Sequence, residues 1–365
     1  MLTSFEVKTL KKGIIFLSLL FFIHHLSLWI LTFYTKNYYL VNALENYDSA
    51  HYNKIINFGY DSRSIAFFPF YPFLIKGISL ILPIPIALQF IGTIFSTFLF
   101  IIFLCLVFHL VGKNEQKYFD LPLYPTTILG FYFFIYSPSS FVFHTHHTES
   151  LFLLLTLLSL IIYKKNWAIA SLLAGFCALT KNQGIVFAFC LAILITTEYK
   201  NYKEKIIKFI ISGLISFSCF SIFLIFQYYK FDNFLAFMEA QKNWHFITSI
   251  NEYVLGFFSL LKYKYLSRFE FIETLYFLFL FIFSFTLLKR EKPIFLYCFI
   301  SLLMLPLQGT LINTYRYTCF LFPMLFVIGD YFSKKNKILI FVLVVFLFYL
   351  NHQMTRNYIM ARWSY

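Results

Sequence analysis

The chain has 365 residues, of which 60% are hydrophobic and 13% are charged, and its net charge at pH 7 is +14. Soluble domains carry about a quarter of their residues as Asp, Glu, Lys and Arg, so this composition excludes an ordinary soluble protein. Apolar runs of about 14 to 25 residues recur along the chain, and a transmembrane helix needs about 20. We therefore predict an all-α polytopic membrane protein, because a transmembrane barrel would show short alternating segments instead.

The apolar runs predict about eleven spans, and because several runs are short, roughly nine to thirteen spans agree with the sequence. The predicted spans are 12–33, 87–111, 121–143, 148–163, 167–180, 184–197, 209–229, 269–288, 293–310, 316–332 and 337–350. The first is read as an uncleaved anchor, because it is too long for a signal peptide and lacks a small-residue cleavage site. No internal repeat or linker is visible, so residues 1–365 are predicted to form one domain.

Basic residues gather in alternate connections between these spans. Of the 30 Lys and Arg residues, 17 fall in 1–11, 112–120, 164–166, 198–208, 289–292 and 333–336, together with Lys12 and Lys337. The positive-inside rule makes this set of connections and the N-terminus cytoplasmic. The positive charge then marks membrane orientation, and we expect no nucleic-acid partner.

The first long connection, at about 34–86, is predicted on the extracytoplasmic side. It contains YDSAHYNKIINFGYDSRSIAFFPFYPF from Tyr47 to Phe73. Spacing i, i+3 puts Asp48 and His51 on one helical face. A carboxylate shielded by aromatic rings can act as a general base, with an imidazole as its orienting partner or proton carrier. The alternative is an ordinary exposed acidic loop residue.

A proline-interrupted apolar segment, AFFPFYPFLIKGISLILPIP, follows at 66–85. Proline breaks helices, so we expect interfacial or half-inserted helices there, whose surface admits a lipid chain beside a polar site. A kinked extra span is the alternative.

The segment FHTHHTES at 143–150 places three histidines and Glu149 where one span ends and the next begins. An ionisable residue at that depth is costly unless it is paired or faces water, so Glu149 is a functional candidate. We expect His146 and His147 to hydrogen-bond a polar substrate. Ligation of a divalent metal by the histidines and Glu149 stays open, although His-x-His-His is not the i, i+4 spacing of a helical zinc site.

Two cations mark further segments on the same predicted side. LTKNQG at 179–184 places Lys181 between two short apolar runs, and NTYRYT at 313–318 places Arg316 at the end of a span. A lysine can hold a phosphate as a point charge, and a guanidinium suits a phosphate or pyrophosphate. Interfacial side chains that snorkel to the membrane surface are the alternative for both.

These segments, in this order, resemble the signatures of the PIG-V-type mannosyltransferases, a family of the GT-C glycosyltransferase superfamily. The first loop is similar to the family pattern Trp-Asp-x-x-His-Tyr followed by Gly-Tyr and Ala-Phe-Phe-Pro, with Tyr47 in place of the Trp. Further similar segments are TESLF at 148–152, TKNQG at 180–184, AQKNW at 240–244 and RYTCFLFP at 316–323. Lys181 stands where the family usually has arginine.

The resemblance implies a GT-C fold and transfer of a sugar, by family default mannose, from a polyprenyl-phosphate donor on the extracytoplasmic face. Transfer would invert the anomeric centre in one displacement, with Asp48 as general base. We infer further that His51 and Glu149 orient the acceptor or share its proton, and that Lys181 and Arg316 neutralise the leaving phosphate. The remaining substrate-binding candidates are Tyr47, Tyr52, His146, His147, Gln241 and Trp244.

The acceptor, a glycolipid, a glycan or a protein, is not readable from the sequence, and no cofactor is predicted beyond the open question of a metal. The bias towards Phe, Ile, Lys and Asn is typical of an AT-rich, bacterial genome, so the expected location is the cytoplasmic membrane. Two alternatives stay open: a lipid-linked oligosaccharide flippase or other transporter, and a polymerase or ligase that uses a polyprenyl-pyrophosphate donor. A transporter should carry mid-span charges and inverted repeats, whereas these spans look nearly free of charge.

Overall fold

The computed structural model describes residues 3–36, 43–82, 86–112, 121–242, 268–289, 291–308, 311 and 313–362. Helices make up the regular structure of these residues, and they contain no strand. The prediction of an all-α protein is therefore confirmed, and its apolar helices are those of a membrane-embedded, multi-pass protein.

Five helices in the described residues are long and apolar enough to cross a membrane. They are α1 (Ser4–Lys36), α5 (Leu88–Leu110), α10 (Tyr202–Phe231), α13 (Arg268–Ser284, continued by η6, Phe285–Lys289) and α17 (Lys337–Ile359). Shorter apolar helices accompany them: α4 (Phe70–Ile81), α7 (Glu149–Ile162), α8 (Trp167–Ala178), α9 (Gln183–Thr196), α14 (Lys292–Leu303) and α16 (Phe322–Phe332). The count of eleven spans stays a prediction.

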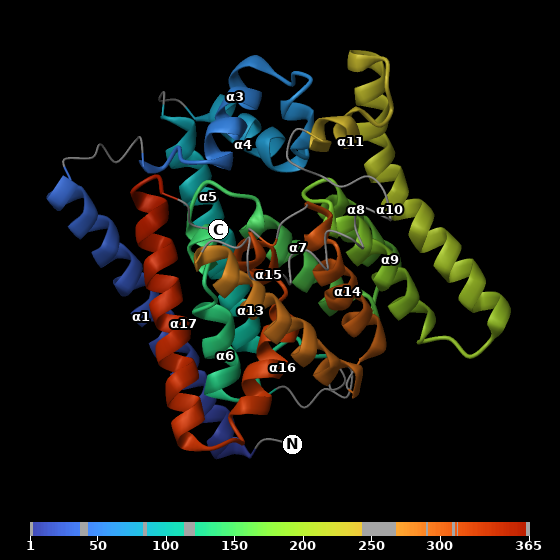
Figure 1. Ribbon diagram of the computed structural model, residues 1–365. Coiled ribbons are helices and arrows are strands. Elements are labelled where there is room, and N and C mark those ends of the chain that lie inside the picture. Colours follow the sequence, from blue (N-terminus) through green and yellow to red (C-terminus); the bar gives the residue numbers. More distant parts are fainter. Residues whose placement is uncertain are drawn as a thin grey trace.

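Short helices complete the described structure. They are α3 (Asp48–Phe58), η1 (Ser64–Ala66), α6 (Ile128–Ile135), η3 (Ser140–His144), α11 (Ala236–Gln241), η7 (Leu305–Gln308) and α15 (Thr314–Cys319). Figure 1 shows α3, α4 and α11 at one end of the molecule, opposite the beginning of α1.

Two predicted spans are broken in the structure. The run 121–143 holds α6 and η3 with Pro138 between them, and the Asn351 amide of α17 donates to the carbonyl of Ser137 at 2.9 Å. The run 316–332 divides into α15 and α16, because Pro323 occupies the first turn of α16, where the missing N–H costs nothing. Apolar runs alone do not show such breaks.

The last helix is longer than predicted. α17 ends at Ile359 and not near residue 350, because its polar-looking second half packs inside the molecule. Asn351 and Thr355 are fully buried. α17 lies beside α1 in Figure 1, and His352 Nδ1 lies 3.1 Å from His24 Nε2 across that contact.

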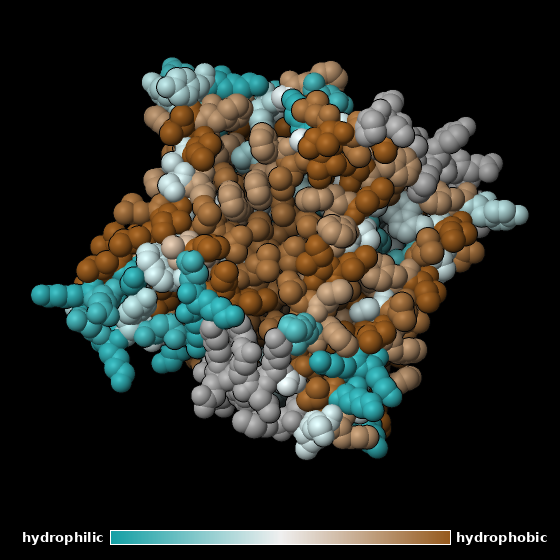
Figure 2. All heavy atoms as spheres, turned by 180° about the vertical axis from the view of Figure 1, so that it is seen from behind, coloured by the Kyte–Doolittle hydropathy of each residue, from teal (hydrophilic) through white to brown (hydrophobic). Residues whose placement is uncertain are grey.

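The outside of the helix bundle is apolar. Figure 2 shows a broad hydrophobic surface across the middle of one face, with hydrophilic residues towards its ends. Single large side chains such as Phe16 on α1, Ile222 on α10 and Phe341 on α17 are more than 60% exposed. A helix surface of this kind is stable against hydrocarbon, not water.

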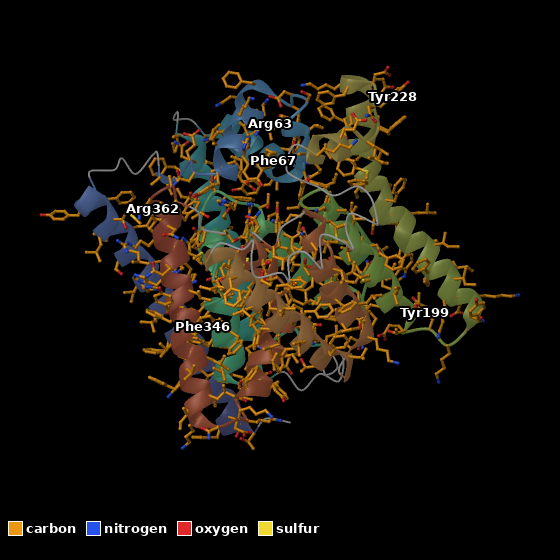
Figure 3. The ribbon with its side chains drawn as sticks, in the orientation of Figure 1. Arg63, Phe67, Tyr199, Tyr228, Phe346 and Arg362 are labelled. Carbon is orange, nitrogen blue, oxygen red and sulfur yellow. The ribbon has the colours of Figure 1, made fainter. Side chains whose placement is uncertain are left out.

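Two of the basic connections that the charge pattern predicts to be cytoplasmic, 164–166 and 198–208, contact one another. Lys164 pairs with Glu198 at 3.2 Å, and the Lys208 ammonium lies 4.1 Å from the centre of the Trp167 ring. Figure 3 shows Tyr199 of this group at the side of the molecule, away from Arg63 and Phe67 of the first long connection. The contact between these two basic connections agrees with the charge pattern, and their cytoplasmic assignment stays a prediction.

Candidate functional site

Four charged side chains, from elements far apart in the sequence, meet in one ion cluster: Asp48, Glu149, Lys181 and Arg316. Arg316 Nη2 lies 2.5 Å from Asp48 Oδ2, and Arg316 Nε lies 2.6 Å from Glu149 Oε1. Lys181 Nζ lies 2.6 Å from the same Glu149 oxygen. The guanidinium of Arg316 thus bridges two carboxylates, and Glu149 bridges two cations.

Exposure differs strongly within the ion cluster. The side chain of Glu149 is 0% exposed, that of Arg316 5%, that of Lys181 7% and that of Asp48 22%. Charges can be buried to this degree only when they are paired, and here two carboxylates balance two cations. Asp48 is therefore the member of the cluster that a substrate entering from outside would reach first.

The two carboxylates both stand at helix N-termini. Asp48 is the first residue of α3, and Glu149 is the first residue of α7. The positive end of the helix dipole stabilises a negative charge at this position. Each helix therefore favours an ionised carboxylate where the cluster requires one.

Lys181 lies in a tight turn between α8 and α9. Its backbone N–H donates to the carbonyl of Cys177 at 3.1 Å. A Cβ on Gly184 would lie 2.1 Å from that same carbonyl oxygen, so glycine is required for the close approach. The turn aims the lysine at Glu149, and the Thr148 hydroxyl oxygen lies 3.4 Å from the ammonium.

Backbone conformations with positive φ precede two members of the cluster. Tyr47, immediately before Asp48, has φ +56° and ψ −122°, and its hydroxyl donates to the carbonyl of Arg362. Asn313, three residues before Arg316, has φ +82°, which asparagine tolerates better than most residues. Backbone strain of this kind is concentrated at functional sites.

The environment of Asp48 keeps it ionised. Burial raises the pKa of its carboxyl group, but the charge and the hydrogen bond of Arg316 outweigh burial, and the net pKa lies below the usual value. At neutral pH, Asp48 is therefore a carboxylate that accepts hydrogen bonds.

His51 shares α3 with Asp48, as predicted, and its half-buried ring stacks on Phe67 with ring centres 4.8 Å apart. Figure 3 labels Phe67 within the unit formed by α3 and α4. Burial lowers the pKa of His51, and Asp48 opposes this shift only in part. The imidazole is neutral at pH 7 and offers one donor and one acceptor nitrogen.

Two other predicted site residues, His146 and His147, are buried and form hydrogen bonds with neighbouring parts of the protein. His146 and His147 are both 0% exposed. His146 Nδ1 lies 3.0 Å from the Tyr71 hydroxyl, and its carbonyl accepts a bond from Ser49 of α3 at 2.9 Å. His147 Nδ1 lies 2.9 Å from the Thr145 hydroxyl. Substrate binding by either ring stays a prediction, and both rings lie below the surface that a substrate would meet.

The three histidines of FHTHHTES do not converge on one point. His144 Nε2 lies 2.5 Å from His25 Nδ1 of α1, whereas His146 and His147 bond to Tyr71 and Thr145. Within the described ranges, no group of three or more His, Cys, Asp or Glu residues is arranged to hold a metal ion.

The remaining predicted substrate ligands differ in position. Tyr52 is 3% exposed and packs edge-on against Phe67 and Tyr71. Gln241 Nε2 donates to the carbonyl of Ala66 at 3.1 Å and so joins α11 to the first loop. Trp244 lies outside the described residues.

Sequence reasoning missed two buried acids. Asp330 of α16 accepts bonds of 2.6 to 3.1 Å from the backbone N–H and hydroxyl groups of Thr126 and Thr127, and thereby caps α6. Glu273 of α13 is 2% exposed. The sequence contained a signal for both residues, namely an acid inside an apolar run. Burial of such an acid costs free energy, so its presence indicates a structural or functional role.

Comparison of the chain with protein-family models, with curated proteins and with solved structures gives no match. The resemblance to PIG-V-type enzymes therefore rests on the quoted segments alone.

Proposed function

We propose that the protein is a membrane glycosyltransferase, with a GT-C fold, that transfers a sugar from a polyprenyl-phosphate donor to an acceptor hydroxyl on the extracytoplasmic face. Mannose is the first sugar to test. The observation that carries the proposal is the convergence of Asp48, Glu149, Lys181 and Arg316 in one cluster. Each of them comes from a segment that resembles the family, and contact between four such segments is not expected of unrelated interfacial residues.

In the proposed reaction, Asp48 accepts the proton of the acceptor hydroxyl while that oxygen attacks the anomeric carbon. The bond from this carbon to the phosphate oxygen breaks, and the polyprenyl phosphate leaves with the electron pair. The proton ends on Asp48, and the configuration at the anomeric carbon is inverted. General-base assistance of this kind contributes about 10²- to 10⁴-fold to a rate.

Arg316 and Lys181 would stabilise the negative charge of the leaving phosphate. Charge develops on the leaving phosphate, and preorganised cations in a site with little water stabilise it best. Arg316 and Lys181 both lie within hydrogen-bonding distance of Glu149, which holds them in place before the donor binds. Glu149 is fully buried, so we assign it to the positioning of these cations and not to contact with the acceptor.

The test is sugar transfer by the purified protein in detergent, from polyprenyl-phosphate-mannose to a panel of glycolipid acceptors. Asp48→Asn should lose at least a hundredfold in rate while the protein stays folded and binds donor. Asp61→Asn is the matched control, because Asp61 is an acid of the same loop that is exposed and paired with Lys54. Full turnover by Asp48→Asn would remove Asp48 as the base.

The flippase alternative gains one feature from the structure, the buried acid Glu273 within a long apolar helix. If the folded wild-type protein neither transfers nor hydrolyses any polyprenyl-phosphate sugar in a panel of hexoses and pentoses, the glycosyltransferase proposal fails. A lipid-flipping assay in vesicles, with Glu273→Gln as the variant, is then the direct test of the transporter. Transfer from a polyprenyl-pyrophosphate donor alone would instead support the polymerase or ligase.

A further inference from the structure

A groove of about 590 Å³ lies between α3, α4 and α10, and none of the four residues of the ion cluster belongs to its lining. Ligand pockets typically measure roughly 300 to 1,000 Å³, so its size is that of a ligand site. Most of its lining is apolar, with Ile56 from α3, Phe73 from α4, and Ile222 and Phe226 from α10.

Two lysines, Lys76 of α4 and Lys230 of α10, are the charged residues of this lining, which contains no acid. Both side chains are exposed, and in the described part of the chain neither forms an ion pair with a carboxylate. The Lys230 ammonium approaches α3 where that helix ends, 3.6 Å from the place of a Cβ on Gly59. The groove therefore presents positive charge from two sides, and no carboxylate of the described residues pairs with it.

The charge and the apolar surface follow one another along α10 in the order of the phosphate and the acyl chain of a phospholipid. Lys230 is in the last turn of α10, a candidate membrane span, and Ile222 lies eight residues earlier, or about 12 Å deeper along the helix. Figure 3 shows Tyr228 at this same end of α10, the end near α3 and α4. α4 has 12 residues, which rise about 18 Å and do not cross a hydrocarbon core of about 30 Å.

This site cannot hold the phosphate of the proposed sugar donor during transfer. Gly59 follows Asp48 by eleven residues, and α3 between them rises about 16 Å. A donor phosphate must lie within one sugar ring of the general base, so a phosphate beside Lys230 is too far away. The occupant that fits has a phosphate at the membrane surface and a hydrocarbon chain below it.

We propose that the groove between α4 and α10 binds an anionic glycerophospholipid of the surrounding bilayer. Its phosphate lies between Lys76 and Lys230, and one acyl chain lies along Ile222 and Phe226. A lipid in this place joins α10 to α3, the helix that begins with Asp48, and so braces the site without taking part in the reaction. The proposal does not depend on the identity of that reaction.

Native mass spectrometry of the full chain, titrated with phosphatidylglycerol or with phosphatidylcholine of the same acyl chains, tests the proposal. We expect one high-affinity site that prefers phosphatidylglycerol by roughly 10- to 30-fold, since each lysine near a lipid surface contributes about 1 kcal/mol. The double variant Lys76→Gln/Lys230→Gln should lose this preference. Lys203→Gln, at the opposite end of α10, should keep it.

A second pair of variants tests the acyl chain. Ile222→Trp fills the groove and should weaken phosphatidylglycerol binding at least tenfold, whereas Ile210→Trp, which is on the same helix but outside the lining, should not. Because any variant can fold poorly, the salt dependence of wild-type binding is measured as well, and the preference should fall as ionic strength rises. Equal affinity for the two lipids, or an unchanged preference in the double lysine variant, would overturn the proposal. Displacement of phosphatidylglycerol from this site by undecaprenyl phosphate at equal concentration would also overturn it and assign the groove to a polyprenyl lipid.

Discussion

Replacement of Arg316 by glutamine should destabilise the protein far more than the loss of an ordinary ion pair. The guanidinium bonds to Asp48 and Glu149, and the side chains of Arg316 and Glu149 are 5% and 0% exposed. Removal of one partner of a buried pair costs about 3 to 5 kcal/mol, because the other charge stays buried without compensation. Lys181 still faces Glu149 in the variant, so we expect the lower end of this range.

The matched control is Lys54→Gln, which breaks the pair between Lys54 and Asp61. These side chains are 54% and 43% exposed, and exposed pairs contribute about 0 to 1 kcal/mol. Thermal unfolding in detergent, followed by circular dichroism, should therefore show a decrease in Tm of about 4 °C for Arg316→Gln and at most about 1 °C for Lys54→Gln. The double variant Arg316→Gln/Glu149→Gln should be less destabilised than the sum of the single variants, because it removes both partners. Equal Tm decreases for Arg316→Gln and Lys54→Gln would refute the reasoning.

Two further outcomes are expected. The pKa of Asp48 is lower in the folded protein than its ordinary value of 3.8, so its ion pair contributes stability above about pH 4, and that stability is lost as the pH falls through the lowered pKa. The Tm difference between wild type and Asp48→Asn should accordingly be constant from roughly pH 5 to 8 and shrink below pH 4, and a difference that shrinks already between pH 7 and 5 would contradict the assigned shift. Gly184→Ala should cost more than 1 kcal/mol, because its Cβ would lie 2.1 Å from the Cys177 carbonyl oxygen, whereas Gly213→Ala, where no atom lies within 4 Å, should be neutral or stabilising by up to about 1 kcal/mol in unfolding measurements.

The membrane character of the chain and the segments that meet at the site could both be predicted from the sequence. Composition is sufficient for the first, since the spans must satisfy their backbone groups as helices in hydrocarbon. For the second, Asp48 was identified by its aromatic surroundings and its i, i+3 spacing to His51, and Glu149, Lys181 and Arg316 by their positions at the ends of apolar runs. The sequence could not predict how these four residues pair. Lys181 and Arg316, which were expected to bind a phosphate, both contact Glu149 in the structure.

The errors have a common physical origin. A hydropathy pattern registers the apolar length of a segment but not the hydrogen bonds that let a helix break or continue. Asn351 satisfies the carbonyl of Ser137 within the predicted span 121–143, and buried polar residues extend α17 beyond residue 350. Asp330, one of the two missed acids, follows the same rule, since threonines of a distant loop donate hydrogen bonds to its carboxylate.

The pairing of Asp48 with Arg316 raises a mechanistic requirement for the proposed reaction. A carboxylate whose pKa is held low by a guanidinium is a weak base, so Arg316 must loosen its contact with Asp48 when the acceptor reacts. The phosphate of the donor is the natural competitor for the guanidinium, and Glu149 keeps hold of Arg316 through Nε while the contact through Nη2 changes. Binding of the donor would in this way make Asp48 a stronger base at the moment when it is needed.

Arg316→Lys separates this role from simple charge neutralisation. A lysine keeps the positive charge, but it lacks the planar fork that bonds to Asp48 and Glu149 at the same time. The free-protein pKa of Asp48 should then rise towards its ordinary value, and the acid limb of the pH profile of kcat/KM, which reports the base of the free enzyme, should move to higher pH. Lys181→Arg is the control, because Lys181 contacts Glu149 and not Asp48, and its acid limb should stay in place. If Arg316→Lys lowers the rate without moving the acid limb, Arg316 acts on the donor alone, and the base that titrates in kcat/KM is not Asp48.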